Sequence, residues 1–335
     1  MLIKPFPKLE NIHAIPIPMP EPPELITANV YAVGKGPVTL IDTGPKTPGS
    51  LAFIQRQLKL TGLDINDIER IIITHGHVDH FGLAVGIQET VGHPVSCFIH
   101  SQDRWRVSSD TFQEVLWSKE ADQFMSVAGI PQKEIETVKK RFSSFKTLCD
   151  PLSEISTMDM EDGDEFTGDG YSLRLIHTPG HTPGTCCLYE SRQKILFSGD
   201  HIIKHITPNP FIELKRHHLC DPNYQSLRAY SESLDKLTGL KVRFVFPGHG
   251  EYIEDLLDII STYRVHHRER MELVWNALKK KSRPLYDIID DVFAYVPEGH
   301  LFLAISEIFV HLEILINEGR AELANPGPPA LYRAL

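Results

Sequence analysis

The sequence predicts a layered α/β domain followed by a smaller, mostly helical C-terminal domain. Three observations lead to this prediction. Short β-rich segments alternate with helical ones up to about residue 260, a polar helical stretch at 101–148 interrupts the alternation, and helical patterns dominate after residue 262. Alternating strands and helices are typical of sheets covered by helices. The chain has 335 residues, enough for two domains, which we place at 1–262 and 263–335.

Each element of the first half has a local signal. The linker Gly34-Lys35-Gly36-Pro37 separates two β-rich runs, and apolar residues recur at helical spacing in the segment that follows. The expected elements are strands Ala28–Val33 and Val38–Asp42, helix Ser50–Thr61, strand Arg70–Thr74, helix Phe81–Val91 and strand Pro94–Ile99. Residues 101–148 are expected to form an inserted helical pair, jointed at Gly129 and Pro131, that serves as a lid.

The second half continues the same pattern and then changes. Its expected elements are strands Ser172–His177, Thr185–Tyr189 and Lys194–Phe197, a long loop at 201–222, helix Ser226–Leu237 and strand Val242–Phe246. Long loops in compact domains tend to be functional. The C-terminal elements are helices Tyr263–Lys281, Leu285–Val292 and Glu307–Gly319 and a hairpin within Ala321–Leu335. Helices followed by a terminal hairpin suggest a winged-helix shape.

Composition narrows the function classes. The chain carries 34 basic and 44 acidic residues, a net charge of −10, which disfavours nucleic acid and anionic membranes as general partners. Its five cysteines are odd in number and follow no disulfide or CxxC spacing, which favours a reducing cytoplasm. The Pro-rich N-terminus does not resemble a signal peptide, and no apolar run approaches the roughly 20 residues of a membrane span.

Seven histidines and aspartates, each placed just after an apolar run, point to metal chemistry. Imidazole and carboxylate are ligands that borderline divalent ions such as zinc, iron and manganese accept. The seven are His75, His77, Asp79, His80, His181, Asp200 and His249. Because residues at i and i+2 do not share a helix face, and Gly76 lies between the first two, we expect His75–His80 to form a loop. Four predicted strands thus deliver ligands at their C-terminal ends, and these ends should converge.

These motifs resemble the signature of the metallo-β-lactamase superfamily, and Leu40-Ile41-Asp42-Thr43-Gly44 is similar to that family's opening hairpin. The resemblance covers about residues 24–260 and implies a four-layer αβ/βα sandwich. It implies that one metal binds His75, His77 and His181, that a second binds Asp79, His80 and His249, and that Asp200 bridges both. Asp42 would orient ligands from behind, although a turn-forming role is equally compatible with its place before Gly44.

The resemblance also implies a reaction. Two divalent ions, zinc with iron or manganese as alternatives, would hold a hydroxide that attacks a carbonyl, with Asp79 as the catalytic carboxylate. An aspartate at position 200 argues against β-lactam hydrolysis, because the commonest true β-lactamases have cysteine there. We expect a glyoxalase II-like hydrolase of a small thioester, ester or lactone. By position alone, the candidate substrate contacts are Lys204, His205, His217, His218 and Tyr224.

Three other functions compete with this hydrolase. A phosphodiesterase or nuclease of the same superfamily needs a basic surface, whereas this chain is acidic. A winged-helix regulator would read DNA with Glu307–Gly319, but residues 263–335 carry nine basic and ten acidic residues and that helix contains Glu307, Glu313 and Glu318. We therefore expect the C-terminal domain to pack against the catalytic domain or the second subunit of a homodimer. The third competitor is an oxidoreductase with iron at the same ligands.

Overall fold

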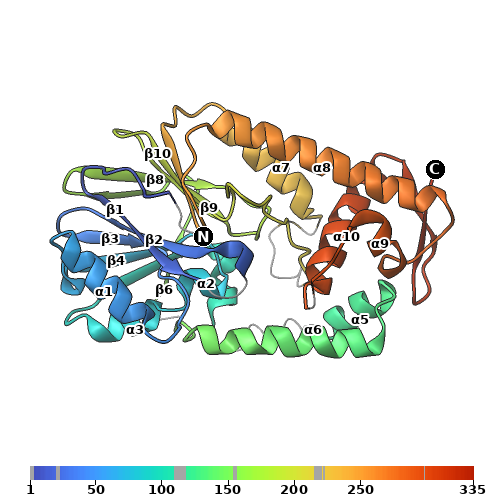
Figure 1. The fold of residues 1–335 in the computed structure, drawn as a ribbon, viewed down its shortest axis with the longest axis horizontal. Coiled ribbons are helices and arrows are strands. Elements are labelled where there is room, and N and C mark those ends of the chain that lie inside the picture. Colours follow the sequence, from blue (N-terminus) through green and yellow to red (C-terminus); the bar gives the residue numbers. More distant parts are fainter. Residues whose placement is uncertain are drawn as a thin grey trace.

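Two β-sheets packed face to face form the centre of the α/β domain (Figure 1). The computed structural model describes residues 4–19, 23–108, 118–153, 157–214, 221, 223–297 and 299–335. The six-stranded sheet consists of β1 (Ile12–Pro18), β2 (Thr27–Val33), β3 (Val38–Ile41), β4 (Ile68–Ile73), β5 (Ser96–His100) and β6 (Thr157–Met160), in that order. The other sheet has the order β11-β10-β9-β8-β7, with β7 (Glu165–Gly168), β8 (Tyr171–His177), β9 (Cys186–Glu190), β10 (Ile195–Gly199) and β11 (Phe244–Pro247).

Helices cover the outer face of each sheet. Apolar side chains of α1 (Ser50–Leu60) and α3 (Ala84–Thr90), among them Ile54 and Ile87, share a buried cluster with the first sheet. On the other side, α7 (Ser226–Leu237) and α8 (Leu256–Lys279) bury Tyr230, Leu234 and Tyr263 against the second sheet. Helix, sheet, sheet and helix are thus stacked, and the predicted four-layer sandwich is confirmed.

The helical insert and the C-terminal residues share one hydrophobic core. The insert contains a 3-10 helix at Ser101–Val107, α5 (Lys119–Val127), α6 (Gln132–Ser144) and a 3-10 helix at Phe145–Leu148. The C-terminal elements are a 3-10 helix at Tyr286–Ile288, α9 (Ile289–Val292), α10 (Leu301–Asn317) and the hairpin β12 (Ala321–Asn325) and β13 (Leu331–Ala334). Met125 and Ile135 of the insert pack in one cluster with Val274, Ile308 and Leu312.

The long helices α6 and α8 run along opposite sides of the molecule, from the sheets to the C-terminal helices (Figure 1). Helix α8 is continuous across residues 262 and 263, where we placed the domain boundary. The expected helical C-terminal region and its hairpin are present. The classification of the C-terminal region as a winged helix and the domain boundary between residues 262 and 263 stay predictions.

Several elements differ from those expected. The single helix predicted at Phe81–Val91 is two helices, α2 (Val78–Phe81) and α3, separated at Gly82. A side chain at Gly82 would lie 2.2 Å from the carbonyl oxygen of Leu148, so only glycine fits at this position. Strand β1 was not predicted because its segment contains Pro16 and Pro18; it pairs only with β2 at the sheet edge, where proline is tolerated.

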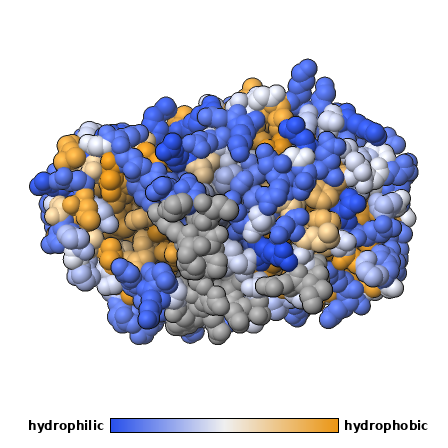
Figure 2. Space-filling model, turned by 180° about the vertical axis from the view of Figure 1, so that it is seen from behind, coloured by the Kyte–Doolittle hydropathy of each residue, from blue (hydrophilic) through white to orange (hydrophobic). Residues whose placement is uncertain are grey.

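The surface agrees with the polar composition. On the face opposite to that in Figure 1, hydrophilic residues cover most of what can be seen of the described chain (Figure 2). In that part of the chain, no helix is both long and apolar enough to cross a bilayer.

Candidate metal centre

All seven predicted ligands meet at one edge of the two sheets. His75 and His77 lie in the loop after β4, and Asp79 and His80 lie on the first turn of α2. His181 follows β8, Asp200 follows β10 directly, and His249 follows β11. The expected convergence of strand ends is therefore present. The interpretation of His75–His80 as a loop was correct only up to His77.

Two glycines allow this close approach. Gly199 has a φ of +48°, and a side chain there would lie 2.6 Å from the hydroxyl oxygen of Thr74. A side chain at Gly248 would lie 2.4 Å from Oδ1 of Asp200 and 2.7 Å from Cε1 of His80. The glycines beside Asp200 and His249 are therefore required by the packing of the cluster itself.

The ligand atoms form two groups joined by Asp200. In the first, Nδ1 of His77 lies 3.0 Å from Nε2 of both His75 and His181. In the second, Nε2 of His249 lies 3.3 Å from Nε2 of His80 and 3.4 Å from Oδ2 of Asp79. The first group and the second each fit a single ion, and a third combination of His75, His80 and Asp200 also does.

The carboxylate of Asp200 faces both groups. Its Oδ2 lies 3.2 Å from Nε2 of His249, 3.7 Å from that of His181 and 4.0 Å from that of His75, and its Oδ1 lies 3.3 Å from Nε2 of His80. Oδ1 is buried and has no hydrogen-bond partner in the described chain. This position between the groups is the one expected of a bridging ligand.

The hydrogen bonds of the Nδ1 atoms show where the Nε2 lone pairs of His181 and His249 point. Nδ1 of His181 donates to the carbonyl of Asn209 (3.0 Å), and Nδ1 of His249 donates to that of Thr27 (2.7 Å). Because a carbonyl oxygen can only accept, the Nδ1 atoms carry hydrogen, and in the neutral rings the Nε2 atoms direct lone pairs inward. Lone pairs about 3 Å apart repel unless a cation lies between them, so the donor set fits divalent metal ions.

Asp42 makes the contacts that the orienting role, one of its two expected roles, requires. Its φ of +57° is unusual for a residue other than glycine. Oδ1 accepts from the amide of Thr74 and Oδ2 from the Thr74 hydroxyl and from Nδ1 of His80, each at 2.8 Å. The carboxylate thus fixes the orientation of His80 and joins β3 to the loop that carries the ligands.

The pKa values of the histidines differ between the two ligand groups. Burial lowers the pKa of His77 to about 3, and it also lowers those of His75 and His181. Burial opposes charge on His249 as well, but Asp200 and Asp79 outweigh it and raise the pKa of His249 to about 10. The pKa of His80 is raised in the same way by Asp200 and Asp42. A metal ion bound to the second group would therefore take the place of protons on His80 and His249.

Comparison with known proteins identifies the family. The profile described as the Metallo-beta-lactamase superfamily matches residues 24–249. This chain belongs to that superfamily. It is 29% identical to "Probable metallo-hydrolase YqjP" of Bacillus subtilis (strain 168), over 91% of this chain and 92% of that protein. It is 24% identical to "Beta-lactamase-like protein 2 homolog" of Drosophila melanogaster, over 91% and 87%.

The fold of the whole chain has a counterpart among solved structures. The metallo-beta-lactamase family protein TTHA1429 from Thermus thermophilus superposes with a TM-score of 0.80 at 24% identity, covering 98% of this chain and 99% of that one. A beta-lactamase domain protein from Burkholderia ambifaria gives 0.77 at 20% identity, covering 98% and 94%. The shared fold therefore includes the C-terminal helices as well as the superfamily's two-sheet domain.

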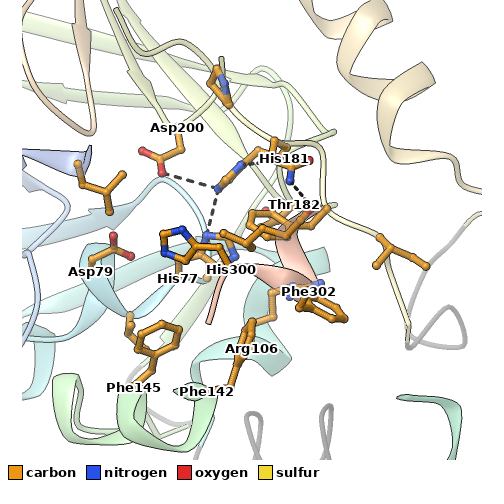
Figure 3. A pocket seen from close by; sticks show the side chains of 18 of the residues that line it. His77, Asp79, Arg106, Phe142, Phe145, His181, Thr182, Asp200, His300 and Phe302 are labelled. Carbon is orange, nitrogen blue, oxygen red and sulfur yellow. Dashed lines mark hydrogen bonds and ion pairs between the residues drawn. The ribbon is translucent and has the colours of Figure 1, made fainter. Parts of the chain in front are cut away.

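A cavity of about 350 Å³ opens beside the predicted metal-ligand residues (Figure 3). His77, Asp79, His181 and Asp200 form part of its wall. Much of the remaining wall is apolar and comes from the insert, the loop after β10 and the start of α10: Phe142, Phe145, Ile206, Phe211, Phe302 and Leu303. The ring of Phe211 lies edge-on to those of His77 and His181, with centroids 5.4 and 5.2 Å apart.

Three of the five predicted substrate contacts are not among the residues that line this cavity. Lys204 pairs with Glu251 at 2.7 Å, and Nε2 of His205 lies 2.6 Å from the carbonyl of Glu24. The hydroxyl of Tyr224 is buried. None of the three is among the cavity residues. His217 and His218 lie outside the described residues. The loop after β10 does line the cavity, but through Ile203, Ile206 and Phe211 rather than through Lys204 or His205.

Asp103 is a central residue that sequence reasoning missed. It is fully buried and accepts hydrogen bonds from the amide of Gly76 (2.8 Å), the hydroxyl of Thr182 (2.6 Å) and the amide of Gly184 (3.0 Å). It therefore joins the loop of His75 and His77 to the loop of His181. A signal was present, because Asp103 closely follows the strand β5 as the metal ligands follow theirs, but we assigned it to the helical insert.

Proposed function

We propose that this protein is a dinuclear metal-dependent hydrolase that attacks the carbonyl of a small thioester, ester or lactone. The observation that supports it most is the cluster itself. Six inward-facing ligand residues surround the carboxylate of Asp200, beside a cavity large enough for a small molecule. The names of similar proteins, such as "Probable metallo-hydrolase YqjP", agree with hydrolysis as the reaction type.

The residues divide the work as follows. His75, His77 and His181 would hold one divalent ion, Asp79, His80 and His249 the other, and Asp200 both. Ions bound there would supply Lewis-acid activation of water and of the substrate oxygen near neutral pH. Asp79 lines the cavity and its side chain is 16% exposed, so it is the ligand carboxylate best placed to orient an attacking water and take its proton.

The packing of α10 does not favour the winged-helix regulator. Helix α10, which would have to read DNA, buries Ile305, Ile308 and Leu312 in the shared core. Its Glu307 pairs with Arg270 of α8 at 2.7 Å. A helix held in this way by its own chain cannot enter a major groove through the same face.

Metal analysis followed by a substrate panel tests the proposal. The purified protein is assayed for zinc, iron and manganese, and then with thioesters, esters, lactones and phosphodiesters before and after removal of metal by a chelator. We expect two ions per chain and hydrolysis of at least one carbonyl class, lost on chelation and restored by added zinc or manganese. Hydrolysis of phosphodiesters alone, or carbonyl hydrolysis that survives complete metal removal, would overturn it.

A further inference from the structure

Arg141 and His300 meet in the cavity wall although they are far apart in the sequence. Arg141 lies in the last turn of α6, and His300 immediately precedes α10. The guanidinium Nη2 donates to Nε2 of His300 at 3.0 Å, and both residues line the cavity that contains His77 and Asp79. Burial, with Arg141 adding to it, lowers the pKa of His300, so the ring stays neutral and can accept this hydrogen bond.

Among the described residues that line the cavity, two arginines have different surroundings. The guanidinium of Arg106 is neutralised: it forms an ion pair with Glu213, and its Nε lies 3.2 Å from Asp103. Arg141 has no carboxylate within ion-pair distance in the part of the chain that is described, and its polar partner there is the imidazole of His300. Within the described residues, Arg141 therefore brings into the cavity wall a positive charge that no ion pair neutralises.

The position of Arg141 is fixed by its neighbours. A side chain at Gly299, where φ is +80°, would lie 2.6 Å from Cδ of Arg141, so the arginine stem passes directly over this glycine. The guanidinium carbon lies 5.8 Å from the centroid of the Phe145 ring. A guanidinium held by a glycine, an aromatic ring and a hydrogen-bond acceptor loses little freedom when it binds an anion.

The wall next to this cation is apolar. The rings of Phe142 and Phe302 pack edge to face with centroids 5.5 Å apart, and both line the cavity (Figure 3). A volume of about 350 Å³ is at the small end of ligand pockets, which span roughly 300–1,000 Å³. Such a cavity accommodates an apolar body of modest size together with one anionic group.

We propose that Arg141, oriented by His300, is an anion-binding subsite, and that the substrate is a small acyl or aryl compound with a carboxylate or phosphate group in addition to its hydrolysable carbonyl. This rests on the proposed hydrolase function and specifies its substrate class. A guanidinium offers paired N–H groups that match the two oxygens of either anion. The metal ligands would act on the carbonyl, and Arg141 would select the other end of the molecule.

Paired substrates test the subsite. We would compare three aryl esters of an apolar carboxylic acid whose far end carries a free carboxylate, a phosphate or an uncharged amide. Since a hydrogen bond to a charged group contributes about 1.5–3 kcal/mol, kcat/KM of the wild type should favour at least one anionic form over the amide by roughly 10–100-fold. The preferred anion distinguishes carboxylate from phosphate.

Variants of α6 provide the matched control. Arg141→Met should remove the preference for the anion while leaving hydrolysis of the amide form within a few-fold, and Arg141→Lys should keep part of the preference. Lys140→Met removes the same charge from the neighbouring exposed position and should retain the full preference. His300→Leu should lower the preference, and His300→Gln, which keeps an acceptor, should partly restore it.

The outcomes separate the subsite from the hydrolase. Equal hydrolysis of charged and uncharged esters by the wild type, or an equal loss on both in Arg141→Met, would overturn the subsite and leave the hydrolase intact. If no carbonyl substrate is hydrolysed, the proposed function fails, and calorimetric binding of an apolar dicarboxylate still tests the subsite. Binding at least tenfold weaker in Arg141→Met than in Lys140→Met would support it, and equal binding would overturn it.

Discussion

The ligands of the metal centre come from short loops after four strands, whereas much of the cavity wall beside them comes from helices in two distant stretches of the chain. The ligand loops are held by buried contacts such as those of Asp42 and Asp103. The cavity wall is formed where α6, near residue 141, meets the start of α10, near residue 302. Under the proposed function, the difference separates two tasks: the strand ends would provide the reaction chemistry, and the helices would provide the choice of substrate.

The largest expected effect is on the strand-end side of this comparison. Asp200→Ala removes the carboxylate that faces both ligand groups, and so should lower kcat/KM at least about a thousandfold, roughly 4 kcal/mol of transition-state stabilisation, together with bound metal. His77→Ala should behave alike. Steady-state kinetics and elemental analysis measure both quantities.

Asp169→Ala, at an exposed turn between β7 and β8, serves as the control and should retain activity and metal. Normal turnover by an Asp200→Ala protein that has been completely freed of metal would refute the assigned chemistry.

Asp103→Asn tests whether the positions of the ligand loops depend on a residue that is not itself a predicted metal ligand. The amide cannot accept all the hydrogen bonds that Gly76, Thr182 and Gly184 donate to the carboxylate. We expect metal affinity to fall about 10–100-fold, the range typical of residues that orient ligands. Competition with a chromophoric chelator measures it, and an affinity equal to that of the wild type would show that the two loops keep their positions unaided.

The same division explains what could be predicted from the sequence. The ligands were predictable because each stands within seven residues of the end of an apolar strand, so local order along the chain carried the spatial information. Asp103, Arg141 and His300 were not recognised as site residues. Arg141 resembles any basic residue at the end of an amphipathic helix, and His300 is 159 residues away. Only the packing of the insert against the C-terminal core brings them together.

The elements of the fold were likewise predictable where the local sequence pattern was strong. Strands and helices with strong periodicity, such as α1 and α7, were located within a residue or two. The weaker elements depended on tertiary contacts. Strand β1 lies at the sheet edge, where its prolines are tolerated, and Gly82 between α2 and α3 lies so close to the Leu148 carbonyl that a side chain would clash there.

On the cavity side, Phe142→Ala should change substrate binding without changing metal content. The ring lines the cavity and packs against Phe145 and Phe302. Loss of an apolar contact of this size corresponds to about 1.5–3 kcal/mol, so KM for apolar substrates should rise roughly tenfold or more while kcat changes little. Phe53→Ala on α1, outside the cavity, is the control. A parallel loss of bound metal would mean that the two regions are not separable.

The smallest effect concerns the helices that support the cavity wall. Nε2 of His311 on α10 lies 3.3 Å from Nδ1 of His267 on α8, and burial lowers their pKa values to about 4 and about 3. Because the folded state holds these rings neutral, the unfolded chain binds more protons below about pH 6.5, and stability should fall as the pH drops from there towards 4.

For His311 alone this linkage amounts to roughly 1–2 kcal/mol between pH 7.5 and about pH 5. Urea unfolding of the metal-loaded protein at both pH values should therefore show a smaller acid-induced loss in His311→Leu than in the wild type. Leu312→Ala, a neighbouring buried position that costs stability without removing a titrating group, should keep the wild-type loss. If all three proteins lose the same free energy of unfolding, the contact between α8 and α10 does not respond to acid, and the cavity wall is as insensitive to pH as its apolar side chains suggest.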